Sequence, residues 1–251
     1  MRQKWAGADG GEMNNMEQSA RKHLLEHKRK IQAWKKAQEL DVIYNKALEY
    51  VVPSKIKYIL VADNPGKKEK EEGCYLSKNG SAGHAAREFF RSKLGKDFDS
   101  EILVLNKSPI YTETTSGLKS WEARFPEKTI SESQEHMASL LLALMRTIPE
   151  AEVWIIGVSE MCPTKIFRYF TKKLLRDATL EEMTRISYFK HFSRNWFFRD
   201  LSLTKDEIIK IGKEELLKVL EETSKKNREK ISDRWCKAKG LLRSHNKHLM
   251  N

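Results

Sequence analysis

The chain has few cysteines, and those it has lie far apart. Its 251 residues include three cysteines, Cys74, Cys162 and Cys236, and no CxxC pair occurs. Structural zinc sites and four-cysteine iron–sulfur clusters take their ligands from such closely spaced pairs. The sequence therefore argues against both kinds of site, and we expect three free, reduced thiols.

Long apolar runs are absent as well. No stretch approaches the roughly 18 apolar residues that a membrane-spanning helix needs. Residues 1–15 contain no apolar stretch of the kind found in secretory signals. We therefore expect an intracellular, cytoplasmic protein without a membrane partner. Glycine-rich phosphate loops of the Walker or dinucleotide-binding type are also missing, which argues against the common nucleotide-binding folds.

Charge, in contrast, is plentiful and mostly of one sign. Lysine and arginine number 47 against 35 aspartates and glutamates, a formal net charge of +12. Such an excess favours polyanionic partners, because each phosphate that is neutralised releases counterions. A lysine-rich solubilising surface is the alternative, and composition alone leaves both open. Hydrophobic residues make up 39% of the chain, which suffices for a substantial core.

Four short apolar runs indicate the fold. They are rich in Val, Ile, Leu and aromatic residues, and they span residues 57–62, 101–105, 152–158 and 185–192. The intervals between them leave room for crossover helices, which we expect at residues 82–94, 131–147 and 164–176. Strands that alternate with helices predict a buried parallel sheet with right-handed crossovers. We therefore expect an α/β three-layer sandwich around a four-stranded parallel sheet.

Helical extensions are expected at both ends of this domain. Residues 1–16 are polar and are predicted to be disordered. From residue 17 to about residue 50 apolar side chains recur at helical spacing, and Pro53 then ends the predicted helix. We place the α/β domain, including this helix, at residues 17–203 and a basic helical extension at residues 204–251. The extension is either an arm that binds nucleic acid or a solvated helix face.

Polar side chains follow three of the four predicted strands. Asp63-Asn64-Pro65-Gly66 follows the first run, Asn106 the second, and His191 lies at the end of the fourth. Ligands bind open parallel sheets at the carboxyl ends of their strands. Each motif also has a purely structural interpretation: Asn-Pro-Gly is ordinary turn chemistry, Asn106 can cap a helix, and a histidine at a strand end can be structural. Their common position at strand ends favours a shared site.

The first two motifs resemble those of the uracil-DNA glycosylase superfamily. That superfamily has a four-stranded parallel sheet between helices. Ala62-Asp63-Asn64-Pro65-Gly66 is similar to the Gly-x-Asn-Pro-Gly motif of its mismatch-specific and single-strand-selective branches. Leu103-Val104-Leu105-Asn106 is similar to the strand that ends in the family's uracil-reading asparagine. The resemblance covers roughly residues 56–200.

Two further segments extend the resemblance. His191-Phe192-Ser193-Arg194-Asn195 resembles the family's last motif, His-Pro-Ser, followed by a loop that enters the duplex. Gly73-Cys74-Tyr75-Leu76 resembles the Gly-x-x-aromatic type of segment that stacks on the base. The four cysteines of the cluster-bearing branches are missing.

The resemblance implies a DNA-repair hydrolase that cleaves the N-glycosidic bond of uracil, or of a related deaminated base, in single- or double-stranded DNA. It implies that Asn64 positions the attacking water and that His191 donates a hydrogen bond to O2 of the departing base. Asp63 is a third catalytic candidate if the turn directs its carboxylate inward. Strand alternation lets only one of Asp63 and Asn64 point into the site.

Substrate contacts follow from the same resemblance. Tyr75 is expected to stack on the base, Asn106 to read its edge because an amide both donates and accepts, and Pro65 and Gly66 to line the pocket. Contacts to nucleic acid are expected from residues that flank these motifs: Lys67, Lys68, Ser193, Arg194, Asn195 and Trp196. We expect a monomer that requires no metal and no organic cofactor.

Two alternatives stay open. Phe192 replaces the family's proline, and together with Asp63 it favours a nucleic-acid-binding protein of the same fold with a weak or inactive site. The other alternative is an unrelated α/β enzyme that acts on a nucleotide or phosphate ester. The missing glycine-rich loop argues against it, although Lys67, Lys68 and Lys70 after the first turn can meet phosphate.

Overall fold

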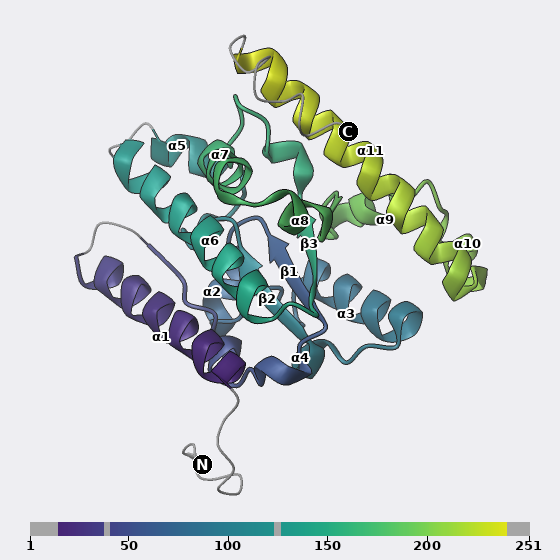
Figure 1. Ribbon diagram of the computed structural model, residues 1–251, viewed down its shortest axis with the longest axis horizontal. Coiled ribbons are helices and arrows are strands. Elements are labelled where there is room, and N and C mark those ends of the chain that lie inside the picture. Colours follow the sequence, from purple (N-terminus) through teal and green to yellow (C-terminus); the bar gives the residue numbers. More distant parts are fainter. Residues whose placement is uncertain (1–14, 38–40, 123–126, 240–251) are drawn as a thin grey trace, which may run out of the picture.

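A computed structural model describes residues 15–37, 41–122 and 127–239 of the chain (Figure 1). Its four strands, β1 (Tyr58–Ala62), β2 (Ile102–Asn106), β3 (Glu152–Ile156) and β4 (Ile186–Phe189), form one sheet in the order β2-β1-β3-β4. All neighbouring strands are parallel. The predicted α/β class and four-stranded parallel sheet are therefore confirmed.

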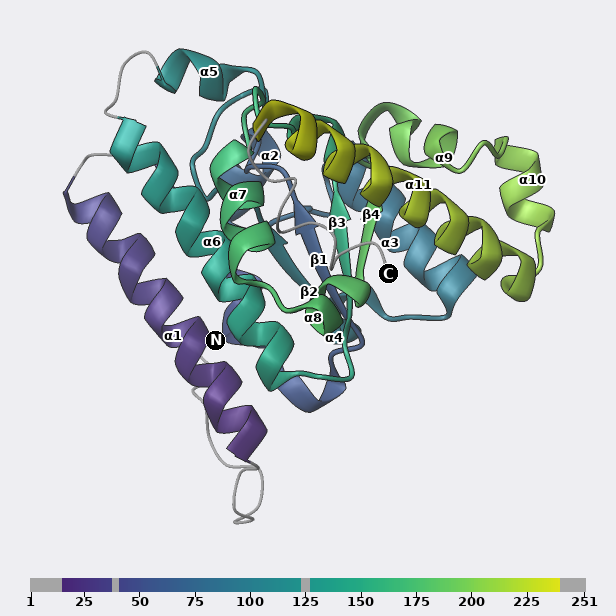
Figure 2. The same ribbon diagram turned by 45° about the horizontal axis from the view of Figure 1, so that its top comes forward.

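Helices cover both faces of the sheet, which explains why its strands are apolar without alternation. On one face Val61 and Leu105 join the core formed with α6 (Glu127–Thr147) and α7 (Arg168–Asp177), and α1 (Asn15–Lys36) packs on α6. On the other face Leu60 and Val104 pack with α3 (Ser81–Leu94) and α9 (Trp196–Asp200). Figure 2 shows these layers from a second side. The three predicted crossover helices are present, with their ends shifted by a few residues.

Short helices connect these elements. They are α2 (Lys67–Glu72), α4 (Phe98–Glu101), α5 (Gly117–Glu122), α8 (Leu180–Thr184) and α10 (Lys205–Lys210), with 3-10 turns η1 (Lys46–Glu49), η2 (Pro53–Lys55), η3 (Val158–Glu160) and η4 (Ser193–Asn195). Within the described ranges no helix combines the length and the apolar character that a membrane crossing requires.

The prediction of one helix from residue 17 to about residue 50 is wrong in its second half. Helix α1 ends at Lys36, and Val42 instead forms an antiparallel bridge with Ile110. The Ile43 N–H donates to Pro109 O at 2.9 Å, and the Asn45 amide donates to Val104 O at 2.9 Å. The apolar residues of this stretch fit a helical spacing, but tertiary hydrogen bonds to β2 and to the segment after it override that preference.

The predicted disordered segment, residues 1–16, falls mostly outside the described residues. Residues 1–14 are not described, whereas Asn15 and Met16 already belong to α1. Residues 240–251 of the predicted C-terminal extension also lie outside the described ranges.

The long helix α11 (Lys213–Lys239) lies along strand β4. Ser224 Oγ accepts from the Tyr188 N–H at 3.0 Å, the Asn227 amide donates to Tyr188 O at 3.0 Å, and Arg228 donates to Ile186 O at 2.7 Å. These bonds satisfy backbone groups of an edge strand that would otherwise be open to pairing. One face of this segment is thus part of the folded domain.

Candidate functional site

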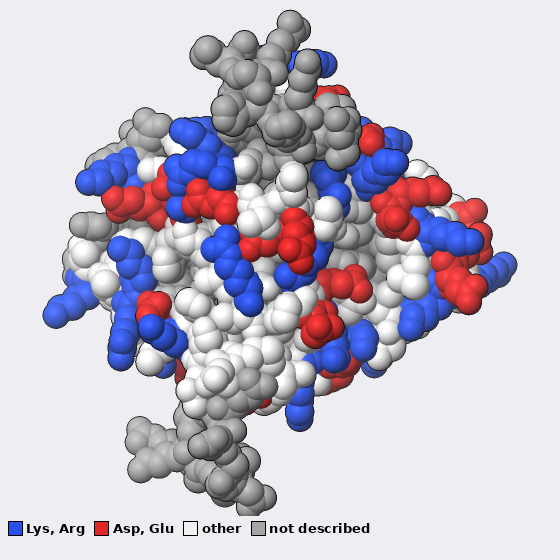
Figure 3. Space-filling model, in the orientation of Figure 1, with Lys and Arg blue, Asp and Glu red and all other residues white. Residues whose placement is uncertain are grey.

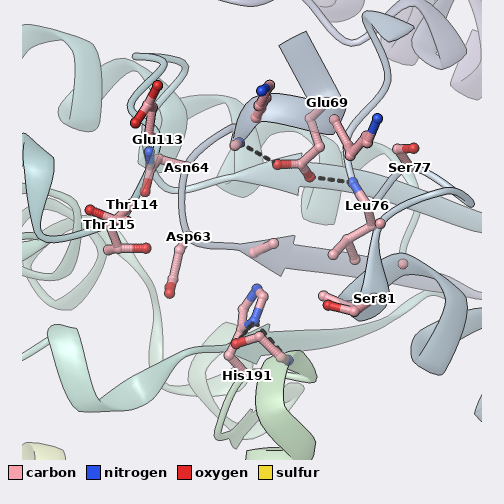
Figure 4. A pocket seen from close by; sticks show the side chains of 18 of the residues that line it. Asp63, Asn64, Glu69, Leu76, Ser77, Ser81, Glu113, Thr114, Thr115 and His191 are labelled. Carbon is pink, nitrogen blue, oxygen red and sulfur yellow. Dashed lines mark hydrogen bonds between the residues drawn. The ribbon is translucent and has the colours of Figure 1, made fainter. Parts of the chain in front are cut away.

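One pocket lies at the carboxyl edge of the sheet, where β1 and β4 end (Figure 4). Its volume is about 650 Å³, within the range of small-molecule sites. Nine of the predicted site residues line it: Asp63, Asn64, Gly66, Lys67, Lys68, His191, Ser193, Arg194 and Trp196. Pro65, Tyr75, Asn106 and Asn195 do not belong to the lining.

The carboxylate of Asp63 projects into this pocket, as Figure 4 shows. Its Oδ1 accepts a hydrogen bond from Lys107 Nζ at 2.6 Å. Gly157 lies directly against it: a Cβ on Gly157 would stand 2.0 Å from Asp63 Oδ1, and the φ of +82° also favours glycine. Position 157 therefore has to be glycine for the carboxylate to occupy this place.

Lys107 is fully buried behind the pocket wall. Burial lowers the pKa of Lys107, and the negative charge of Asp63 acts in the opposite direction. The sequence reasoning gave this lysine no role. Strand alternation could have indicated its importance, because it places residue 107 on the face of the sheet opposite Asn106. A lysine buried on that face needs an acidic partner.

Asn64 is tied to the segment that follows β2. Its Nδ2 donates to Thr112 Oγ1 at 2.8 Å and lies 3.3 Å from both Pro65 O and Ile110 O. Its Oδ1 is buried and has no hydrogen-bond partner among the described residues. The amide is therefore held through its nitrogen, and its buried oxygen remains an unpaired acceptor.

His191 is oriented by the loop that follows β4. Its Nδ1 accepts from the backbone N–H of Ser193 at 3.1 Å. Because a backbone N–H can only donate, the proton of the neutral ring is assigned to Nε2. Burial lowers the pKa of His191; Lys107 acts in the same direction and Asp63 against it. The site thus holds a neutral imidazole, whose ring extends toward the pocket centre opposite Asp63 (Figure 4).

Glu69 links two turns of the pocket wall, a role that the sequence reasoning also missed. Its two oxygens accept from the Gly66 N–H at 2.6 Å and from the Leu76 N–H at 2.5 Å. Burial raises the pKa of Glu69. Leu76 has a φ of +44°, a conformation that is strained for leucine, and Arg87 donates to its carbonyl oxygen. Leu76 is thereby fixed in the pocket lining.

Two residues expected to contact the base lie elsewhere. Tyr75 is 2% exposed, and its hydroxyl donates to Ile43 O at 2.6 Å, so it is a core residue, and Leu76 lines the pocket next to it. Asn106 is fully buried. It pairs in register with Ala62, which does line the pocket.

The amide of Asn106 is unpaired among the described residues. Neither its Nδ2 nor its Oδ1 makes a hydrogen bond to any described residue. Leaving one buried polar group unpaired costs about 1–3 kcal/mol, so such groups call for a specific explanation. A ligand edge or a water beside Ala62 would satisfy the amide.

The loop after β4 presents an aromatic ring beside cationic side chains. Phe192 is buried and stacks on Phe197 with ring centroids 4.1 Å apart. Trp196 is 43% exposed. The Arg199 guanidinium and the Lys190 ammonium lie 5.1 Å and 5.8 Å from its ring. Exposed aromatics next to cations are typical of surfaces that bind single-stranded nucleic acid.

The net positive charge of the chain is not concentrated on the face drawn in Figure 3, where basic and acidic side chains are interspersed. The pocket lining is mixed in the same way, because Glu69, Glu113 and Glu160 accompany Lys67 and Lys68. Overall charge alone therefore does not define a binding surface.

In the described part of the chain, no group of three or more His, Cys, Asp or Glu side chains is arranged to hold a metal ion. No protein-family model matches the chain, and no curated protein matches it in sequence. Function therefore has to be argued from the geometry of the pocket.

Proposed function

We propose that this chain is a DNA glycosylase-like hydrolase that releases uracil, or a related deaminated base, from DNA. The observation that supports this best is the pair of groups that face one pocket: the Asp63 carboxylate and the neutral imidazole of His191. Hydrolysis of an N-glycosidic bond can use a donor to the departing base and a carboxylate that takes the proton of the attacking water.

The departing base becomes negatively charged as the bond to C1′ breaks. A neutral His191 can donate from Nε2 to that charge, and preorganised donors of this kind are often the largest catalytic contribution. The sugar becomes positively charged at the same time. The carboxylate of Asp63 can stabilise it and take the proton of the attacking water. Asn64 Oδ1 is unpaired but buried, so its contact with that water requires a local shift of the pocket wall.

Recognition of the base is proposed for Asn106. Its unpaired amide can accept from N3–H and donate to O4, a combination that uracil offers and cytosine does not. Since the pocket is lined by Ala62 but not by Asn106, this reading requires the wall beside Ala62 to open when a base enters. Extrusion of a base from the duplex costs a few kcal/mol, and Trp196 can recover part of it by stacking.

The test is release of free uracil from a uracil-containing oligonucleotide. We expect Asn64→Ala and His191→Ala to abolish release, and His23→Ala, which changes a histidine outside the pocket, to retain it. Absence of product from every deaminated base tested, at high enzyme concentration and long incubation, would contradict the proposed activity.

A second candidate is a nucleic-acid-binding protein of the same fold without catalysis. The positions of Tyr75 and Asn106 outside the pocket lining favour it. It predicts binding of DNA or RNA that weakens steeply with salt and no abasic product. Mobility-shift and strand-cleavage assays on the same oligonucleotide separate the two candidates.

A further inference from the structure

Lys107 joins the carboxyl ends of three neighbouring strands. It directly follows β2 and donates through Nζ to the carbonyl oxygen of Ala62, at the end of β1, and to that of Ile156, at the end of β3. The third acceptor is Asp63 Oδ1 at 2.6 Å. Three acceptors account for the three protons of an ammonium group.

The contacts of Asp63 occupy one carboxylate oxygen, Oδ1, and leave Oδ2 able to accept a proton. Lys107 occupies Oδ1, and Gly157 fits against the carboxylate without a side chain. No residue of the described ranges donates a hydrogen bond to Oδ2. The carboxylate is therefore fixed through Oδ1 and faces the pocket shared with His191 (Figure 4).

We infer that Lys107 is a positioning residue for base release: it holds Asp63 through Oδ1 so that Oδ2 can receive the proton of the attacking water. This inference rests on the proposed function. In the step, a water O–H bond breaks and its proton moves to Oδ2, while the water oxygen bonds to C1′. The bond from C1′ to the base nitrogen breaks, its electron pair leaves with the base, and the base anion then takes a proton from solvent.

A purely structural role for Lys107 makes a different prediction. If the lysine only stabilised the sheet edge, its removal would lower the unfolding temperature or weaken substrate binding without a selective effect on the chemical step. Enzymatic general bases contribute about 10²–10⁴-fold to rate. Misplacement of the Asp63 carboxylate should therefore lower kcat and leave KM nearly unchanged.

The experiment compares single-turnover and steady-state uracil release by the full chain and four variants: Lys107→Met, Asp63→Asn, the double variant Asp63→Asn/Lys107→Met, and Lys57→Met. We expect Lys107→Met to lower kcat by about 100-fold and to change KM by less than about threefold. The double variant should be no slower than Asp63→Asn, because Lys107 acts through Asp63. Lys57, an exposed lysine just before β1, is the matched control and should be dispensable.

The outcomes separate the inference from the proposed function. If the unaltered chain releases no base, the proposed function fails and the inference fails with it. If the unaltered chain is active, three results would overturn only the role of Lys107. These are an unchanged kcat in Lys107→Met, a rise in KM alone in that variant, and a kcat of the double variant below that of Asp63→Asn. If Lys107→Met does not fold, Lys107→Gln replaces it, because glutamine donates a hydrogen bond without a charge, and the same comparison of kcat and KM applies.

Discussion

Acidification should destabilise this fold through two histidines between α1 and α6. His27 Nδ1 and His136 Nε2 lie 3.0 Å apart, and His27 is fully buried. Burial, with a smaller effect of His136, lowers the pKa of His27 to about 3. Burial, with a smaller effect of Lys30, lowers the pKa of His136 to about 4. Both rings are therefore neutral in the folded protein at any pH near neutrality.

The size of the effect follows from proton uptake on unfolding. In the unfolded chain a histidine has a pKa of about 6.5 and gains its proton below that value. The folded state stays neutral down to the lowered pKa values, so stability is full above pH 6.5 and is lost as pH falls toward 4 and 3. Each histidine contributes up to about 1.4 kcal/mol per pH unit. Between pH 7 and pH 5 the pair should cost about 4 kcal/mol of unfolding free energy.

Urea unfolding, followed by circular dichroism between pH 7 and pH 5, measures this loss. Between pH 7 and pH 5 the unfolding free energy of the His27→Leu/His136→Leu variant should fall by about 4 kcal/mol less than that of the unaltered chain. His191, whose pKa is also lowered by burial, remains in both proteins and cancels from the comparison. His23→Leu, in the same helix but partly exposed, is the matched control. Parallel stability curves for the unaltered chain and the double variant would refute the reasoning.

Three further substitutions test other parts of the structure. Gly83→Ala places a Cβ 2.1 Å from Ser77 O and should lower stability by about 1–3 kcal/mol in thermal unfolding. Gly212→Ala is the control and should cost less, because a Cβ there meets no atom within 4 Å and the backbone φ is not left-handed. Phe192→Pro removes a buried ring that stacks on Phe197, so we expect a loss of about 3–5 kcal/mol in the same assay. An unchanged midpoint would contradict the packing described. Trp196→Ala should weaken binding of a single-stranded oligonucleotide by about 1–3 kcal/mol in fluorescence anisotropy while the unfolding midpoint stays constant.

The sheet could be predicted from sequence because its strands are buried on both faces. The runs that became β1 and β2 are apolar at nearly every position, and both strands are buried throughout. The predicted helix is wrong from residue 41 to about residue 50 because the apolar spacing there also fits a helix. Only the tertiary partners, such as Ile110 for Val42, decide between the two conformations.

The pocket could be predicted in part. The rule that ligands bind at the carboxyl ends of parallel strands predicted that Asp63, Asn64, Asn106 and His191 share one edge. Asp63, Asn64 and His191 line one pocket, whereas Asn106 is buried outside its lining. Lys107 was missed because its importance depends on a partner 44 positions away in sequence. Leu76 lines the pocket and Tyr75 does not, because the hydrogen bonds of Glu69 and Arg87 fix the turn in a conformation that local sequence does not reveal.

The proposed activity depends on the chemistry of the pocket that Asp63 and His191 share. The most direct test is to quantify free uracil, by chromatography with mass detection, after the full chain is incubated with single- and double-stranded oligonucleotides that contain one uracil. We predict stoichiometric free uracil and an abasic site, both lost in His191→Ala. Intact oligonucleotide after exhaustive incubation, with the protein bound to it, would contradict the glycosylase proposal and favour a binding protein.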